Sequence, residues 1–195
     1  MKLFISPGAC SLASHIVLQD SGLKFTTETV NWENGQINQI TPKGYVPALE
    51  LDNGQILTEG AAILQFIADQ VPSKNLIPAN GTLERYRAQE WLNYISTEVH
   101  KGFSPLFNDK TLPEARALAT IELEKKFEFL SNSLKGHTFL MGNQFTVCDA
   151  YLFTVLSWSK HVNVDLSKWP VLLGFVEAAK NRPGTMAALK AEKLI

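Results

Sequence analysis

The sequence contains little cysteine and no long apolar run. Two cysteines occur among 195 residues, Cys10 and Cys148, and they lie far apart in the chain. Such a pair makes no disulfide framework and suits a reducing compartment, so we expect a cytoplasmic protein. No uninterrupted apolar stretch is long enough to cross a bilayer. Pro7-Gly8 follows Met1 too soon for the apolar core of a signal peptide.

An excess of charge of one sign is also missing. Eighteen Lys and Arg residues balance 19 Asp and Glu residues, which leaves a net charge of −1. We therefore expect neither nucleic acid nor a membrane surface as a partner. No Cys and His residues have the spacing of a metal site, and we expect no metal. With 45% apolar residues, the chain is typical of a globular protein with one large or two small domains.

The first part of the chain predicts an α/β layer structure. A strand, a helix and a strand of this length form a βαβ unit, which implies parallel pairing. The turn Asp52-Asn53-Gly54 between two apolar runs predicts a β-hairpin, and a helix follows it. The expected strands are 2–5, 24–30, 46–51 and 55–57, and the expected helices are 10–18 and 61–71.

The rest of the chain predicts helices alone. Residues 71–81 are rich in Pro, Gly and Asn and read as a linker. We therefore divide the chain into an α/β domain, 1–77, and an all-helical domain, 83–195. The expected helices of the second domain are 83–103, 113–134, 147–159, 170–180 and 186–190. The helix 147–159 is apolar nearly all round, which places it in the middle of a bundle.

Two short motifs carry more specific information. Thr146 and Asp149 have the spacing of a capping box at the start of the helix 147–159. Cys10 follows the turn Pro7-Gly8 and begins a helix, whose N-terminal partial positive charge favours thiolate over thiol. A buried structural cysteine explains the same position, because free cysteine is among the most buried residue types.

Six blocks of the sequence resemble, in order and over the full length, those of bacterial beta-class glutathione S-transferases. They are Ser6–Ser11, Pro42–Leu49, Leu57–Ile63, Glu90–Ile95, Glu98–Phe103 and Phe145–Tyr151. The resemblance implies a thioredoxin-like N-terminal domain (βαβ-ββα) followed by a C-terminal helical bundle, assembled as a homodimer. It also implies a detoxifying transferase that conjugates the glutathione thiol to small hydrophobic electrophiles, with glutathione as co-substrate and no other cofactor.

The resemblance also implies which residues form the site. Cys10 and His100 are the catalytic pair, and the Val46-Pro47 bond is cis. Glu59 takes the ammonium group of glutathione, and the Gly60 amide takes its γ-glutamyl carboxylate. The full set of glutathione-binding residues is Ala9, Cys10, Val46, Pro47, Glu59, Gly60, Asn93, Thr97 and His100, with Asn93 reaching the partner subunit's glutathione. We expect Phe103, Phe107 and Trp158 to form the wall of the electrophile site.

The chain departs from the family pattern at two glutathione contacts. The family uses a connector lysine against the glycyl carboxylate of glutathione, and this chain has no lysine between Lys24 and Lys43. Many relatives have a serine where this chain has Gly60, so one hydroxyl donor is missing. Both departures predict weaker contacts to the carboxylates of glutathione.

Two other functions stay open from the sequence. A thiol-disulfide oxidoreductase would act through a mixed disulfide between Cys10 and glutathione. Because position 13 is Ala13, that chemistry would be monothiol. The other alternative is a non-catalytic ligand-binding relative, since a fold alone does not establish an activity.

Overall fold

Four short strands form one mixed sheet in the N-terminal part of the chain. The computed structural model describes residues 1–195, and its strands are β1 (Lys2–Ile5), β2 (Thr26–Thr29), β3 (Ala48–Glu50) and β4 (Ile56–Thr58). Their order is β2-β1-β3-β4, with β1 parallel to β2 and antiparallel to β3, and with β3 antiparallel to β4. The parallel pair and the hairpin that the sequence predicts are both confirmed.

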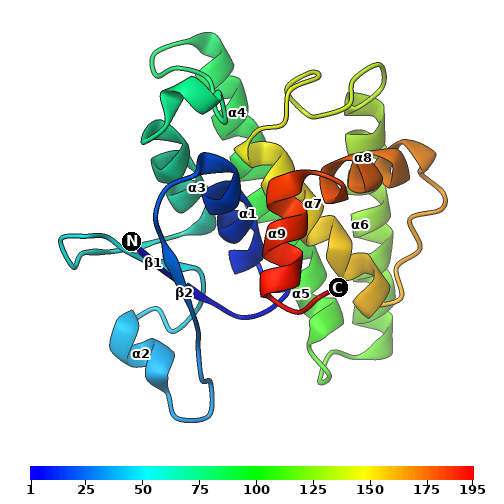
Figure 1. Ribbon diagram of the computed structural model, residues 1–195. Coiled ribbons are helices and arrows are strands. Elements are labelled where there is room, and N and C mark those ends of the chain that lie inside the picture. The colour runs from blue at the N-terminus through cyan, green and yellow to red at the C-terminus, as the bar shows by residue number, and fades with distance from the viewer.

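Helices cover both faces of the sheet because alternate residues of β1 point to opposite sides. Leu3 and Ile5 join the main core, to which α1 (Ser11–Ser21) and α3 (Gly60–Asp69) contribute. Phe4 joins a small cluster with Ile37 from α2 (Gln36–Ile40) on the other side. Figure 1 shows α2 set apart from the other helices at the edge of the molecule. β1 ends at Ile5, and the chain continues directly into the loop that carries Cys10.

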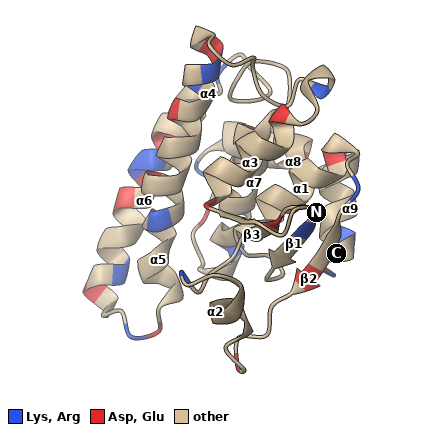
Figure 2. Cartoon of the chain, turned by 90° about the vertical axis from the view of Figure 1, so that its left-hand side faces the viewer, with Lys and Arg blue, Asp and Glu red and all other residues tan.

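The remaining elements are helical, as predicted. They are η1 (Pro72–Lys74, 3₁₀), α4 (Leu83–Tyr94), η2 (Ile95–His100, π), α5 (Lys101–Phe107), α6 (Pro113–Ser133), α7 (Val147–Ser157), η3 (Trp158–His161, 3₁₀), α8 (Pro170–Lys180) and α9 (Pro183–Ala191). Charged residues gather on outward-facing helices such as α6 (Figure 2). No helix combines the length and the apolar character needed to span a bilayer.

The helix predicted over 83–103 contains a change of helix type. α4 passes into the π-helical segment η2 and then into α5, so the helical run extends to Phe107. A π-helix has i→i+5 hydrogen bonds, and such segments occur often at functional sites. Residues after the start of η2 are therefore displaced around the helix axis relative to a continuous α-helix.

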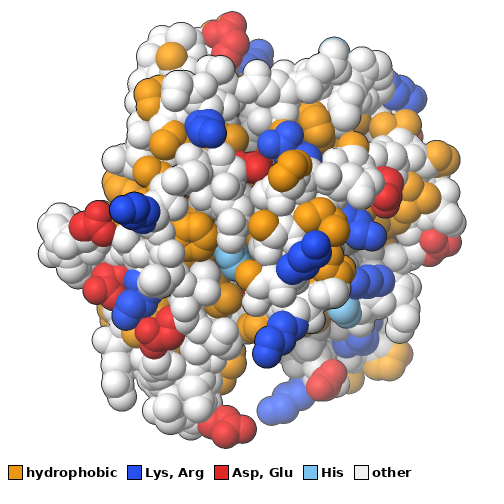
Figure 3. All heavy atoms as spheres, in the orientation of Figure 1, with side chains coloured by type: hydrophobic (Ala, Val, Ile, Leu, Met, Phe, Trp, Pro, Cys, Tyr) orange, Lys and Arg blue, Asp and Glu red, His pale blue; other side chains and the backbone are white.

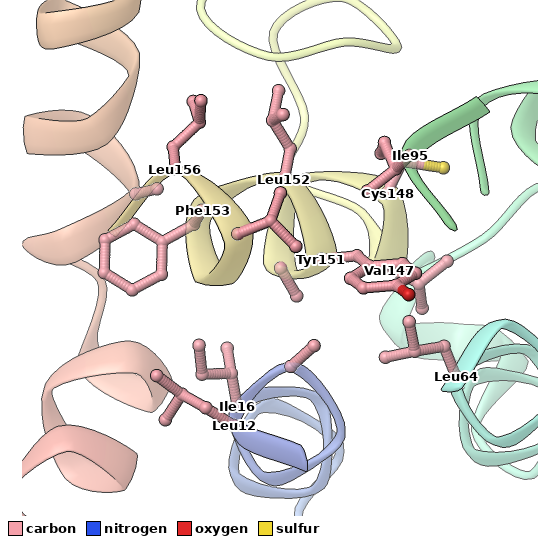
Figure 4. Packing of buried hydrophobic residues seen from close by; sticks show 14 of the residues in the cluster. Leu12, Ile16, Leu64, Ile95, Val147, Cys148, Tyr151, Leu152, Phe153 and Leu156 are labelled. Atoms are coloured by element: carbon pink, nitrogen blue, oxygen red, sulfur yellow. The ribbon is translucent and has the colours of Figure 1, made fainter. Parts of the chain in front are cut away.

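α7 lies at the centre of the helical part. It packs against α1, which covers the sheet. Its residues from Val147 to Leu156 are all buried. Figure 4 shows α7 between Leu12 and Ile16 of α1 on one side and Ile95 on another. The predicted capping box at its start is confirmed, and the Asp149 carboxylate accepts 2.8 Å hydrogen bonds from the backbone amides of Thr146 and Leu140.

Candidate active site

Two cavities meet at Cys10 and His100, which line both of them. The smaller cavity has a volume of about 270 Å³ and is lined by Cys10, Tyr45, Val46, Pro47, Glu59, Gly60, Ser96, His100, Lys101 and Tyr151. The larger has a volume of about 560 Å³ and is lined by Pro7, Gly8, Ala9, Cys10, His100, Ser104, Phe107, Trp158, His161 and Leu194. Two adjacent spaces with a shared thiol and imidazole suit a reaction between two substrates.

Burial favours the protonated form of the Cys10 thiol at neutral pH, although its place at a helix start favours the thiolate. Its Sγ donates to the carbonyl of Val46 at 3.2 Å. Burial raises the pKa of Cys10 to about 11, although the nearby backbone amides and the Lys101 ammonium favour the thiolate. Loss of hydration therefore outweighs the partial charge at the helix N-terminus. Cys10 can donate a hydrogen bond at neutral pH, and only a small fraction of it is nucleophilic.

His100 is held as a neutral imidazole between two aromatic residues. Its Nδ1 forms a 2.8 Å hydrogen bond with the Tyr151 hydroxyl, and its ring stands edge-on to Trp158 at 4.9 Å between centroids. Burial, together with the positive charge of Lys101, lowers the pKa of His100 to about 4. Its Nε2 has no hydrogen-bond partner in the protein. A neutral imidazole with one free nitrogen can accept a proton or share one with a bound thiol.

Glu59 stands at the start of α3 as an ionised carboxylate. Its Oε1 accepts hydrogen bonds from Lys43 Nζ at 2.5 Å and from the Tyr45 hydroxyl at 2.7 Å. The bond from Lys43 is the main reason that the pKa of Glu59 is lowered. Its φ of 71° lies in the left-handed region, which costs a non-glycine residue about 1–2 kcal/mol. The carboxylate and the free amides of the first turn of α3 can hold an ammonium and a carboxylate side by side.

The predicted glutathione residues divide among three places. Six of them line the smaller cavity: Cys10, Val46, Pro47, Glu59, Gly60 and His100. The Val46-Pro47 bond is cis, as the resemblance implies. Ala9 lines the larger cavity instead. Asn93 and Thr97 line neither cavity and are exposed. The π-helical segment brings Ser96 to the cavity wall with His100, and contacts of Asn93 and Thr97 with glutathione stay predictions.

The predicted wall of the electrophile site needs one correction. Phe107 and Trp158 line the larger cavity, but Phe103 is fully buried and does not. The Phe103 ring packs edge-on against Trp158 at 5.7 Å and lies 6.1 Å from Phe127. Its position on the inward side of α5 makes it a support for Trp158. Phe107 leaves 49% of its surface exposed and provides most of the open aromatic surface.

Several cavity residues were not predicted from the sequence. Tyr151 carries a hydroxyl in the middle of a mostly apolar helix, which is a signal that the sequence offers. Lys101 reads as an ordinary exposed lysine, yet it lines the smaller cavity. The others carry no local signal, because separate loops and helices bring them to the site. They are Tyr45 and Ser96 in the smaller cavity, and Pro7, Gly8, Ser104, His161 and Leu194 in the larger.

The loop before Cys10 is held from both sides by the C-terminal part of the chain. The Gly8 amide donates to Glu192 Oε2 at 2.8 Å, and the Gly8 carbonyl accepts a hydrogen bond from Trp158 Nε1 at 2.8 Å. Glu192 Oε1 also contacts His15 Nδ1 at 2.9 Å, and both side chains are almost fully buried. α9 packs against α1, which makes these contacts possible. The helical part of the chain thus fixes the position of the thiol loop.

A third cavity, of about 510 Å³, lies at the linker between the sheet and the helical part. Its lining includes Asp69, Asn75 and Glu84, and it contains no thiol and no imidazole. The Asp69 carboxylate is already paired with the Arg85 guanidinium by bonds of 2.8 and 2.7 Å. The space has none of the reactive groups that meet at Cys10.

Comparisons with known proteins give one consistent result. Residues 8–70 match the family described as "Glutathione S-transferase, N-terminal domain", and residues 94–183 match "Glutathione S-transferase, C-terminal domain". The chain is 46% identical over 200 residues to "Glutathione S-transferase GstA" of Escherichia coli O157:H7, with 100% of both chains covered.

Solved structures agree with these matches. "Ternary complex of BphK, a bacterial GST" superimposes with a TM-score of 0.97 at 46% identity, covering 99% of this chain and 100% of that one. A sphingomonad glutathione S-transferase complexed with glutathione gives a TM-score of 0.96 at 42% identity, with 100% of both chains covered. "Bacterial beta class Sphingomonas chungbukensis Glutathione S-transferase" gives the same three values.

Proposed function

Because the chain belongs to the glutathione S-transferase family, we propose that its two adjoining cavities form one active site for conjugation. Glutathione occupies the smaller cavity, and an electrophile occupies the larger. One observation carries the proposal: Cys10 and His100 line both spaces. The sulfur of glutathione has to meet the electrophilic carbon, and the junction of the cavities is the place where two bound molecules can touch.

The smaller cavity offers complementary groups for the ends of glutathione. Oε2 of Glu59 has no partner in the protein and can take the γ-glutamyl ammonium. The Gly60 amide opens α3 and can take the neighbouring carboxylate. The main chain of Val46, before the cis Pro47, provides the groups for the cysteinyl part. Lys101 lines the same cavity and is a candidate replacement for the missing connector lysine.

The conjugation step follows from the protonation states at the junction. The glutathione thiol loses its proton to His100 Nε2 or to water, and the Cys10 thiol donates a hydrogen bond that stabilises the resulting thiolate. With an aryl halide, the thiolate sulfur attacks the carbon that bears the halogen. A carbon–sulfur bond forms, the carbon–halogen bond breaks, and halide leaves with the bonding electron pair. Cys10 stays a thiol throughout.

Disulfide chemistry is the weaker alternative for Cys10. It requires the Cys10 thiolate to attack glutathione disulfide, form a mixed disulfide and release one glutathione. Burial raises the pKa of Cys10 to about 11, so little thiolate is available at neutral pH. The scarcity of Cys10 thiolate therefore favours conjugation over disulfide chemistry.

We further propose that two copies of the chain form a homodimer through α4 and α6. Trp91, Tyr94 and Phe129 form an aromatic cluster on this face, and Phe129 is 49% exposed. Asn93 lies exposed on the same helix, where it could reach the other subunit's glutathione. Light scattering should give twice the chain mass, and Phe129→Lys should shift it toward one chain mass. A single chain mass for the unaltered protein contradicts the proposal.

We also propose a cytoplasmic role in detoxification. Both cysteines are free thiols, which fits a reducing compartment. The larger cavity has mostly apolar and aromatic walls, which suit small hydrophobic electrophiles of several shapes.

Two measurements test the conjugation proposal. Calorimetry should detect glutathione binding, and 1-chloro-2,4-dinitrobenzene should be conjugated at a rate above the uncatalysed reaction. His100→Gln should lower kcat/KM by about tenfold to a hundredfold, in the range for loss of one acid–base group. A folded protein that neither binds glutathione nor conjugates the aryl halide contradicts the proposal. A glutathione adduct on Cys10 that turns over faster than conjugation would favour the disulfide alternative.

A further inference from the structure

The walls of the larger cavity differ in chemical character. Its lining includes the apolar residues Phe107, Trp158 and Leu194 and the polar residues His100, Ser104 and His161. No carboxylate side chain lines this cavity. Ser104 and His161 can each donate a hydrogen bond. The cavity is therefore suited to an occupant with an aromatic body and an accepting or anionic group.

Three unpaired lysines stand next to the lining residues in the chain. Lys101 follows His100, Lys160 precedes His161, and Lys193 precedes Leu194. All three are exposed, and none takes part in an ion pair or a side-chain hydrogen bond. Blue side chains gather over the face that carries α9 and the C-terminus (Figure 3). The positive charge near this cavity is therefore not cancelled by contacts within the protein.

The field of one of these lysines reaches the reacting groups. The Lys101 charge lowers the pKa of Cys10, of His100 and of Glu59. The nearby carboxylates are engaged elsewhere: Glu59 with Lys43 and Tyr45, and Glu192 with His15 and the Gly8 amide. A negatively charged molecule that enters the larger cavity thus meets the polar groups of Ser104 and His161 and no side-chain acid, and exposed lysines adjoin its lining residues in the chain.

We propose that the larger cavity selects aromatic electrophiles that carry a carboxylate, with the ring against Phe107 and Trp158 and the carboxylate toward His161 and Ser104. Lys160 and Lys193 add attraction at the entrance, where unpaired charges raise the local concentration of an oppositely charged substrate. This inference rests on the proposed conjugation, since it names the substrate class of that same site. His161 and the two lysines act as specificity residues and take no part in the chemical step.

A matched pair of substrates tests the proposal. 4-Chloro-3,5-dinitrobenzoate and its neutral methyl ester undergo the same displacement of chloride by glutathione, and they differ chiefly in the charge of the carboxyl group. For each substrate, kcat/KM is divided by the rate constant of its uncatalysed reaction with glutathione, which removes the difference in intrinsic reactivity. The ratio of the two normalised values, anionic over neutral, is the readout. We expect a ratio above one in the unaltered protein.

Variants identify the residues responsible. His161→Gln and the double variant Lys160→Gln/Lys193→Gln should each lower the ratio by about threefold to tenfold, the size that one or two exposed charges supply. Added salt should lower it in the unaltered protein, because salt screens exposed charges. The control is Lys74→Gln/Lys135→Gln, which removes the same charge from exposed lysines outside both cavities and should leave the ratio unchanged.

The outcomes separate the two proposals. Conjugation of the neutral substrate with a ratio at or below one, unaffected by the variants, overturns this inference and leaves the proposed function in place. An equal fall in the ratio for the control variant also overturns it, because net charge would then explain the effect. A folded protein that conjugates neither substrate overturns the proposed function, and this inference with it.

Discussion

The backbone amide of Gly8 donates a 2.8 Å hydrogen bond to the carboxylate of Glu192, which lies 184 residues later in the chain. The same carboxylate contacts His15 at 2.9 Å, and the Glu192 side chain is fully buried. The loop that carries Cys10 is thus positioned by a residue just beyond the last helix. The thiol site consequently depends on the C-terminal part of the chain for its geometry.

Removing this carboxylate should destabilise the protein. Glu192→Ala leaves the partly buried Gly8 amide and the buried His15 imidazole without their acceptor, which should lower the free energy of unfolding by about 2–5 kcal/mol. Urea unfolding measures the effect, and calorimetry should show weaker glutathione binding as well. The control is Glu177→Gln, which changes an exposed carboxylate bonded only to Asn181 and should cost less than about 0.5 kcal/mol. Equal losses for the two variants would contradict the role of Glu192.

The Cys10 thiol should react slowly with alkylating reagents at neutral pH. With its pKa raised to about 11 by burial, its thiolate fraction at pH 8 is on the order of 0.1%. The alkylation rate with iodoacetamide should rise about tenfold per pH unit from pH 7 to pH 10. Cys10→Ser identifies the labelled site, because Cys148 is fully buried. A rate that levels off below pH 9 would show a Cys10 pKa well below 11 and would contradict the effect of burial.

His100 should make the stability of the protein depend on pH. Its pKa is about 4 in the folded state and 6.5 in its ordinary range, so the unfolded chain binds the proton more tightly. The contribution is present in full above pH 6.5 and is lost as pH falls toward 4. Between pH 7 and pH 5, the free energy of unfolding should fall by up to ~2 kcal/mol more in the unaltered protein than in His100→Gln. Equal losses of unfolding free energy in the two proteins would contradict the lowered pKa of His100.

The capping box at the start of α7 should contribute strongly to stability. Asp149 is fully buried and accepts hydrogen bonds from two backbone amides and from the Thr146 hydroxyl. Asp149→Ala leaves those donors without an acceptor and should cost about 2–4 kcal/mol. Thr146→Ala keeps the two amide bonds and should cost less, about 1 kcal/mol. Thermal unfolding compares the two variants, and the opposite order would contradict this account of the helix start.

Local patterns predicted most of the secondary structure. Residues 170–180 are predicted as a helix, and α8 spans Pro170–Lys180. The Asn53-Gly54 turn, the apolar helix α7 and its capping box depend on neighbouring residues, so the sequence contains their signals. Six of the nine expected glutathione residues line the smaller cavity. Their assignment came from the family resemblance, since local spacing by itself identified none of them as a glutathione contact.

The features that the sequence did not predict depend on contacts between distant segments. The protonated state of Cys10 results from burial by both parts of the chain, which outweighs the local effect of α1. Glu192 reaches Gly8 only because α9 packs on α1. Phe103 is buried and Ser96 lines a cavity on a helical run that changes type at Ile95. The pattern of apolar residues does not predict a change from α-helix to π-helix.

The most direct test of the central claim is a crystal structure with S-hexylglutathione, whose two parts should fill the two cavities. The peptide should lie in the smaller cavity, with its ammonium at Glu59 and its sulfur beside Cys10 and His100. The hexyl chain should extend into the larger cavity against Phe107 and Trp158. A peptide bound elsewhere, or a hexyl chain that points away from Phe107 and Trp158, would contradict the claim that these two cavities form one conjugation site.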